Sequence, residues 1–319
     1  MKKILAGLTA LAAAVTLAAP VSAQDYPTRP VSVMVSYSPG GATDFQARIV
    51  TMVATNEEYL GQPIVIINKP GAGGKVGWND FAENAAKDGY ELAAYNVPHF
   101  IAQSIQSETK YDIDNLEPIA NWGSDPAVLM VGKDSQFNSL DDLVKFAKEN
   151  PGKVTVNGAG LFVGHHIAFL QLEKATGADF TYVPEQGGAP ALKNVIGGQV
   201  MVGINNLSDA YRSQDSLKIL AIADVERNTE FLPDVPTFKE QGYDVDDSSV
   251  NFRGIMAPKG TPPEVIEKLA KAVPAMFQDA AVKKQMAAGG SPLRVMTREE
   301  VQEMWTKRKA YLTELLKGL

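Results

Sequence analysis

The sequence VSVMVSYSPGGATD, residues 31–44, combines a strand, a loop and the start of a helix in one short segment. Residues 31–37 predict a strand, and residues 43–59 predict a helix. Gly40 and Gly41 allow the backbone between them to approach a ligand closely, and Thr43 with Gln46 has capping-box spacing. The free N–H groups at the start of this helix predict an anion site, against the plainer alternative of an ordinary strand-to-helix turn.

The rest of the chain repeats this alternation of short apolar strands and amphipathic helices. Further strands are predicted at residues 64–67, 92–96, 128–131, 154–157, 181–183, 200–205 and 217–223, and further helices at residues 77–86 and 298–316. The strands are apolar on both faces, as buried parallel strands are. The alternation predicts an α/β fold with two mostly parallel sheets and helices on both faces of each.

A second strand-to-helix loop, NGAGLFVGH at residues 157–165, has G-x-G-x-x-x-G spacing. This spacing resembles a dinucleotide fingerprint, and Glu185 follows the next strand, where a ribose-binding acid would lie. An exported dehydrogenase is therefore one alternative. Leu161 and Phe162 argue against it, because two bulky apolar side chains inside the loop would crowd a pyrophosphate.

Polar side chains also end two later strands, at Glu185 and at Asn205 with Asn206. Open α/β sheets bind ligands at such strand ends. His165 and His166 open the predicted helix after the second loop, but no G-x-S-x-G elbow supplies a nucleophile for them. We expect no catalytic residue. The glycine-rich segment 70–77 lacks the spacing of a phosphate loop and is interpreted as a turn.

The first residues have the pattern of a secretory signal peptide. Lys2 and Lys3 precede a short apolar run, and Val21-Ser22-Ala23 supplies small residues at a cleavage site before Gln24. We therefore expect residues 1–23 to be removed on export to the periplasm. The apolar run is too short for a membrane anchor.

Composition excludes several classes of function. Without Lys2 and Lys3 the chain has 28 Lys and Arg against 37 Asp and Glu, a net charge of −9, so we expect no nucleic-acid partner. The absence of cysteine removes thiol catalysis, disulfides and thiolate metal sites. The three histidines are too few, and too poorly spaced, for a metal centre, and we expect neither a metal nor a cofactor.

Short motifs along the whole mature chain resemble one known family. They include YPTRP (26–30), SPGG (38–41), NKPGAGG (68–74), DGY (88–90), NPGK (150–153), GGQV (197–200), LPDVPT (232–237) and APKGTP (257–262). In this order they are similar to the solute-binding proteins of tripartite tricarboxylate transporters, the Bug or TctC family. The resemblance implies a type II periplasmic binding protein with two lobes that close like a Venus flytrap around a small organic acid.

The resemblance also implies how the ligand is held and delivered. Loops 37–44 and 158–165 would bind one carboxylate through backbone amides and hydroxyls, and a membrane permease would receive the acid. We expect one lobe at residues 24–125 plus 246–319, the other at residues 126–245, and hinges near Asp125 and Val245. Candidate ligand-binding residues are Tyr37, Ser38, Gly40, Gly41, Ala42, Thr43, Asp44, Gly158, Ala159, Gly160, Phe162, Val163, Gly164, His165, Glu185, Asn205 and Asn206.

Two departures from the common family pattern bear on the ligand. Phe162, with the apolar residues beside it, suggests an acid with a hydrophobic or aromatic body. Glu185 would repel a second carboxylate or pair with the amine of an amino acid. Arg48 lies four residues after Asp44 and is expected to pair with it rather than with the ligand. A signalling partner in place of the permease, and a ligand-free structural protein, remain alternatives.

Overall fold

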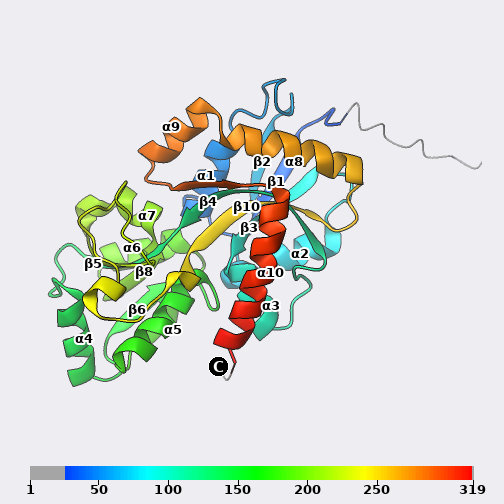
Figure 1. The fold of residues 1–319 in the computed structure, drawn as a ribbon. Coiled ribbons are helices and arrows are strands. Elements are labelled where there is room, and N and C mark those ends of the chain that lie inside the picture. The colour runs from blue at the N-terminus through cyan, green and yellow to red at the C-terminus, as the bar shows by residue number, and fades with distance from the viewer. Residues whose placement is uncertain (1–25, 318–319) are drawn as a thin grey trace, which may run out of the picture.

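The computed structural model describes residues 26–317 and contains two α/β lobes, each built on its own sheet. Figure 1 shows the lobes side by side, with strands β4 and β10 running from the first lobe towards the second. The predicted signal peptide lies outside the described residues. Within residues 26–317, no helix is both long and apolar enough to cross a membrane.

The first lobe contains a six-stranded sheet in the order β11-β4-β10-β3-β1-β2. Its strands are β1 (Val31–Val35), β2 (Ile64–Asn68), β3 (Glu91–Val97), β4 (Leu116–Asp125), β10 (Asn251–Pro258) and β11 (Leu293–Met296). Its helices are α1 (Ala42–Thr51), α2 (Lys75–Asn84), α3 (His99–Gln106), α8 (Pro263–Phe277), α9 (Ala280–Ala288) and α10 (Arg298–Leu315). All three tryptophans of the chain, Trp78, Trp122 and Trp305, are fully buried in its core.

The second lobe contains a five-stranded sheet in the order β7-β6-β8-β5-β9. Its strands are β5 (Ala127–Gly132), β6 (Thr155–Gly158), β7 (Thr181–Pro184), β8 (Val202–Asn206) and β9 (Leu217–Ala223). Its helices are α4 (Leu140–Glu149), α5 (Gly164–Thr176), α6 (Gly188–Ile196) and α7 (Leu207–Arg212). Two separate apolar clusters form its core.

The two-lobed α/β fold agrees with the sequence, but the sheets are mixed rather than mostly parallel. β1 pairs in parallel with β2 and β3, and β6 with β7 and β8. β10 is antiparallel to both neighbours, and so is β5. The cause is the crossing between lobes: only Pro126 separates β4 from β5, and the chain returns to the first sheet through β10.

The sequence did not predict β4, β10 and β11. β4 carries Pro118, Asn121 and Gly123, residue types that are depleted in strands, and its pairing with β10 contains two register shifts. The first helix ends at Thr51, before the predicted residue 59, because residues 52–61 form successive turns. The last helix, at Arg298–Leu315, lies where it was expected and begins with a capping box at Thr297 and Glu300.

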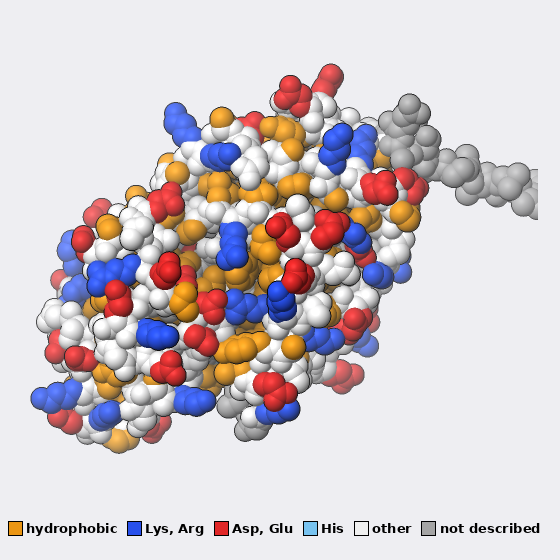
Figure 2. Space-filling view, viewed as in Figure 1, with side chains coloured by type: hydrophobic (Ala, Val, Ile, Leu, Met, Phe, Trp, Pro, Cys, Tyr) orange, Lys and Arg blue, Asp and Glu red, His pale blue; other side chains and the backbone are white. Residues whose placement is uncertain are grey.

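Charged side chains of both signs are mixed on the face of the receptor shown in Figure 2. Figure 2 shows Lys and Arg interspersed with Asp and Glu over both lobes of this face. Most of the ion pairs are exposed, such as Arg29 with Asp88 and Lys69 with Asp80. Exposed pairs contribute little to stability, so the buried pair described below is the electrostatic feature of greatest weight.

Candidate ligand site between the lobes

A small cavity lies where the two lobes meet. Its volume is about 20 Å³, which is room for roughly one water molecule. Residues of both lobes line it: Tyr37, Gly41, Ala42, Thr43, Asn96, His99, Ala159, His165, Gly188, Asn206 and Asn251. Among these lining residues there is no Asp, Glu, Lys or Arg.

Four helices begin at this cavity. Gly41 precedes α1, His99 and Gly188 are the first residues of α3 and α6, and His165 is the second residue of α5. The first N–H groups of a helix have no partner within the helix, and the helix dipole is positive at this end. Two lobes therefore direct positive helix ends at one point without any formal charge lining it.

Three buried polar atoms at the cavity have no hydrogen-bond partner. They are Asn96 Oδ1, His99 Nδ1 and His165 Nε2, and each of these side chains is at most 2% exposed. Seven such atoms occur in the described part of the chain, so nearly half of them belong to residues that line this one small cavity. Buried polar groups are nearly always satisfied in native proteins, so this concentration indicates a site that is completed by another molecule.

The hydrogen bonds of the two histidines define their neutral forms. His165 Nδ1 accepts from the Ala159 N–H at 3.1 Å, so the proton of the neutral ring is on Nε2, which faces the cavity. Burial lowers the pKa of His165 to about 4. Burial, with smaller effects from His165 and Arg253, lowers the pKa of His99 well below its usual value. Both rings are neutral at pH 7 and present N–H donors.

A fully buried ion pair of the first lobe lies next to the cavity, and its arginine also bonds to the second lobe. Arg253 on β10 donates through Nη1 to Asp125 Oδ2 at 2.7 Å, and both side chains are at most 1% exposed. Its Nη2 donates to Asn206 Oδ1 at 2.6 Å, and its Nε to Thr43 Oγ1 at 3.2 Å. Arg253 therefore holds cavity-lining side chains from both lobes while its charge is balanced by Asp125.

Side chains of loop 37–44 already have hydrogen-bond partners within the protein. Asp44 accepts from both Arg48 Nε and Nη2, as predicted, and also from Asn68 Nδ2 and the Gly40 N–H. Burial alone would raise the pKa of Asp44, but these hydrogen bonds outweigh it and lower the pKa. Ser38 Oγ donates to the Gln186 carbonyl of the second lobe at 3.3 Å.

The start of α1 already contacts one carboxylate of the protein. The Ala42 N–H donates to Asp209 Oδ2 of the second lobe at 3.3 Å, and Asp209 also pairs with Arg212. Burial raises the pKa of Asp209, although Arg212 opposes the shift. This bond shows that the helix end accepts an anion in this geometry, and that the lobes are in contact.

Loop 158–165 packs directly on the first lobe. A Cβ atom at Gly160, where φ is +138°, would lie 2.7 Å from Gly73 Cα, and one at Gly164 would lie 2.5 Å from the Ser249 carbonyl oxygen. The Leu161 carbonyl accepts from Gln103 Nε2 at 3.2 Å. Glycine is therefore required at both positions by close approach of the other lobe, and no phosphate is needed to explain it.

Comparison with known proteins assigns the chain to a family. The model of the tripartite tricarboxylate transporter family receptor matches residues 47–314. The chain belongs to this receptor family. Protein BugT of Bordetella pertussis is 34% identical over 307 residues, which are 95% of this chain and 93% of BugT.

Solved structures agree with that assignment. A periplasmic transporter is 31% identical, with a TM-score of 0.84 over 92% of this chain and 98% of its own. MatC of Rhodopseudomonas palustris, with bound malate, is 27% identical, with a TM-score of 0.82 over 92% of this chain and all of MatC. The fold of the receptor described here is therefore that of a periplasmic binding protein, and the family is one of solute-binding receptors.

The receptor brings seven of the predicted site residues to the cavity: Tyr37, Gly41, Ala42, Thr43, Ala159, His165 and Asn206. The predicted residues that lie in the same segments but do not line the cavity are Ser38, Gly40, Asp44, Gly158, Gly160, Val163, Gly164 and Asn205. Their role in binding stays a prediction. Phe162 packs against His166, with ring centroids 5.4 Å apart, and against the core of the first lobe.

Glu185 does not line the cavity either. Its carboxylate accepts from Asn194 Nδ2 of α6 at 2.5 Å, and its N–H donates to the Gly158 carbonyl. The two hypotheses about the ligand, an apolar body beside Phe162 and charge selection by Glu185, stay predictions. In this geometry, Phe162 and Glu185 could influence the choice of ligand only through the residues that separate them from the cavity.

Sequence reasoning missed four lining residues: Asn96, His99, Gly188 and Asn251. Asn96 and His99 end and follow β3, so the rule for polar residues at strand ends would have found them. Gly188 begins α6, three residues after Glu185, and was not among the predicted site residues. Asn251 begins β10, and no local signal marks it, because the strand itself was not predicted.

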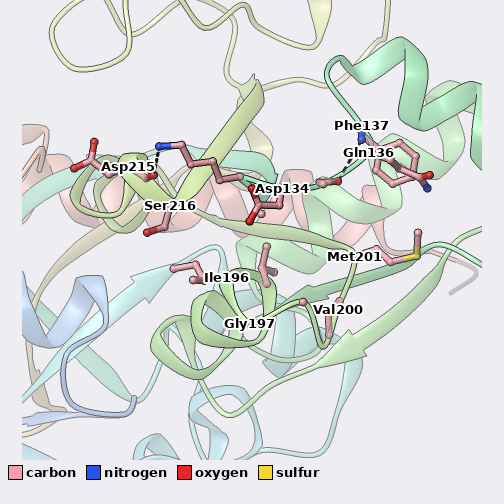
Figure 3. Close-up of a pocket in the computed structure, with 14 residues that line it drawn as sticks. Asp134, Gln136, Phe137, Ile196, Gly197, Val200, Met201, Asp215 and Ser216 are labelled. Carbon is pink, nitrogen blue, oxygen red and sulfur yellow. Dashed lines mark hydrogen bonds between the residues drawn. The ribbon is translucent and has the colours of Figure 1, made fainter.

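A larger hollow in the described part of the receptor lies at the other end of the second sheet. It has a volume of about 700 Å³ and lies between the end of β5, the end of α6 and the residues before β8 and β9. In Figure 3, Asp134, Ile196 and Val200 surround it, and the hydrogen bond from Lys133 to the Asp215 carbonyl lies along its edge. None of the unpartnered buried polar atoms lines it, so the cavity between the lobes is the better candidate.

A metal centre has no basis in the described part of the chain, where no three His, Cys, Asp or Glu side chains converge to hold an ion. His99 and His165 approach one another across the lobes with ring centroids 6.3 Å apart. His166, next in sequence, faces away towards Phe169 and Tyr182. The three histidines thus have two different environments and do not act as one cluster.

Proposed function

We propose that this receptor captures a small organic carboxylate between its lobes and delivers it to the membrane permease of a tripartite tricarboxylate transporter. The observation that carries the proposal is the convergence of three unpartnered buried polar atoms, Asn96 Oδ1, His99 Nδ1 and His165 Nε2, on one interlobe cavity. In this proposal the receptor acts by binding alone, without a catalytic residue or a cofactor.

The chemistry of the cavity favours a carboxylate over other small molecules. Neutral N–H donors and the beginnings of four helices attract an anion, whereas no acidic side chain among the lining residues repels it. No lysine or arginine among them forms a direct ion pair either. Backbone amides, the two histidines and the asparagine amides would hold the carboxylate by hydrogen bonds.

Binding requires the lobes to move. A cavity of about 20 Å³ is too small to admit an acid of several carbon atoms, so the lobes separate to let the ligand in and close again around it, with the cavity enlarged by the ligand. The moving bodies are residues 24–125 plus 246–319 and residues 126–245, and the hinges lie near Asp125 and Val245. A ligand that contacts both lobes binds the closed forms better and shifts the population towards them.

The family assignment and a neighbour support this role. The receptor family is defined by tripartite tricarboxylate transporters, and MatC holds malate. In this proposal the chain is exported to the periplasm by residues 1–23, and its closed form is the one that the permease recognises. A signalling partner that read the same closed form would be distinguished by isolating the membrane proteins bound to the liganded receptor.

The first test is a thermal-shift panel on the mature chain from Gln24. It includes mono-, di- and tricarboxylates, aromatic acids, amino acids and nicotinamide dinucleotides. A ligand at a hundredfold excess over its dissociation constant adds about 2.7 kcal/mol of stability, which raises the melting temperature by several degrees in a chain of this size. A shift with one class of acids supports the proposal. No shift with any acid, and one with a dinucleotide, would contradict it.

A further inference from the structure

The buried arginine determines which atoms of the neighbouring amides face the cavity. Arg253 can only donate, so Asn206 must present its Oδ1 to Nη2 at 2.6 Å. Asn206 Oδ1 also accepts from Asn251 Nδ2 at 3.3 Å. The orientation of Asn251 is then fixed, and its own Oδ1 accepts from Asn96 Nδ2 at 3.1 Å.

This chain of donors and acceptors ends at Asn96. Its Nδ2 donates to Asn251 Oδ1 and to Thr43 Oγ1, and the latter also accepts from Arg253 Nε. The remaining atom, Asn96 Oδ1, is an acceptor without a partner on a side chain that is 1% exposed. Reversing the Asn96 amide would place Oδ1 against Asn251 Oδ1, which is unfavourable.

The unpartnered atoms of the cavity therefore have a mixed character. His165 Nε2 is a donor because Nδ1 accepts from Ala159. His99 Nδ1 is a donor because Nε2 faces Asn251 Nδ2 at 3.5 Å. Asn96 Oδ1 is an acceptor. A plain carboxylate has acceptors only, so it would satisfy both histidines and leave the buried Asn96 oxygen unpaired.

We propose that the ligand is a small hydroxycarboxylate, whose carboxylate accepts from the histidines and whose hydroxyl donates to Asn96 Oδ1. This inference rests on the proposed function and specifies its substrate class. Arg253 is the positioning residue, because it fixes the orientation of Asn96 through Asn206 and Asn251 without contacting the ligand. All of these residues except Asn206 and His165 belong to the first lobe, so Asn96 takes this orientation when the lobes close and Asn206 meets Arg253 and Asn251.

A hydroxyl fits this acceptor better than an ammonium group does. An ammonium group brings a full charge and three donors, and the lining residues contain no carboxylate to balance it. An amino acid of the same skeleton would therefore bind more weakly than the hydroxy acid.

The test compares acids of one skeleton that differ in a single group. Calorimetric titration uses lactate, propionate and alanine, then malate, succinate and aspartate, and the same three forms of any acid that the thermal-shift panel finds. We expect the hydroxy acid to bind about tenfold more tightly than the acid without the hydroxyl, and more tightly than the amino acid. Equal binding of the hydroxy and unsubstituted acids, or preference for the amino acid, overturns this inference and leaves the proposed function standing. Failure of every acid overturns both.

Two variants connect the preference to Asn96. Asn96→Ala removes the acceptor and is expected to abolish the difference between the hydroxy acid and the unsubstituted acid. Asn157→Ala is the matched control, because Asn157 Oδ1 is also buried and unpartnered but does not line the cavity. The control should retain the tenfold preference. If Asn96→Ala retains it as well, Asn96 is not the acceptor and the inference fails.

Discussion

The loops at residues 37–44 and 158–165 look alike in sequence, since each follows a strand, contains glycines and opens a helix, yet they contribute differently to the cavity. In the first loop, Asp44 is saturated by Arg48, Asn68 and the Gly40 N–H. In the second loop, His165 satisfies one ring nitrogen locally and leaves the other, Nε2, without a partner.

The difference shows how similar local signals support different roles. A side chain whose bonds are all internal stabilises its loop, and the ligand can use only the backbone there. A side chain that leaves one buried atom unpaired lowers stability by itself and offers that atom to a ligand. We therefore expect substitution of Asp44 in the first loop to change stability, and substitution of His165 or Gly160 in the second loop to change affinity.

The largest effect is expected from removing the arginine that bonds to Thr43 of the first loop and to Asn206 of the second lobe. Arg253→Met leaves the Asp125 carboxylate buried without its cation, so we expect a loss of about 3–5 kcal/mol in the free energy of unfolding. Chemical denaturation measures it. The double variant Arg253→Met with Asp125→Asn should recover much of the loss. A single variant as stable as the parent would show that the pair carries no weight in the fold.

The loss of stability at low pH tests the burial of His166, which follows the second loop. Burial lowers the pKa of His166 to about 4, against about 6.5 in the unfolded chain. The unfolded chain therefore binds the proton more readily, and stability is complete above pH 6.5 and falls as the pH decreases towards 4, by up to about 1.4 kcal/mol per pH unit for this one group.

The variant His166→Asn isolates that contribution. The Phe162 N–H donates to His166 Nδ1 at 3.2 Å. The Asn side chain can keep an acceptor for this N–H, but the Asn side chain cannot be protonated. Denaturation at several pH values measures how the free energy of unfolding depends on pH. Between pH 6.5 and 4, this dependence should be weaker in the variant than in the parent, by the amount that corresponds to about one proton. Identical slopes would mean that His166 titrates normally in the folded receptor.

Asp44 in the first loop should respond through stability alone. Asp44→Asn removes the charge that accepts from Arg48 and the Gly40 N–H, and we expect a loss of about 1–3 kcal/mol with nearly unchanged affinity for the acid. Asp80→Asn, which removes a half-exposed pair with Lys69, is the control and should cost less than about 0.5 kcal/mol. A large loss of affinity in Asp44→Asn would erase the distinction between the loops.

The second loop should respond through affinity. Gly160→Ala places a Cβ atom 2.7 Å from Gly73 Cα, so the lobes can no longer approach fully, and we expect at least a tenfold loss of affinity, about 1.4 kcal/mol. Gly177→Ala shares the positive φ but has no atom within 4 Å. The control should bind as the parent does, and equal affinities of the two variants would show that this contact does not limit closure.

Local patterns predicted much of the fold and part of the site. The pair of Asp44 with Arg48 followed from spacing along one helix, and β1, the first loop and the start of α1 followed from one short segment. β10 and Asn251 could not be predicted in this way, because they acquire their role from residues far away in the sequence. The unpaired state of His165 Nε2 could not be predicted either, because an atom is recognised as unpaired only when all the residues that the fold places around it are known.

The central claim is that the cavity between the lobes binds the acid, and His165→Ala tests it most directly. Calorimetric titration would use the acid that gives the largest thermal shift, with His166→Asn as the control, because His166 does not line the cavity. Loss of a hydrogen bond to a charged group costs about 1.5–3 kcal/mol, so we predict at least a tenfold loss of affinity for His165→Ala and none for the control. Unchanged affinity in His165→Ala, with the variant folded, would place the ligand elsewhere and contradict the account.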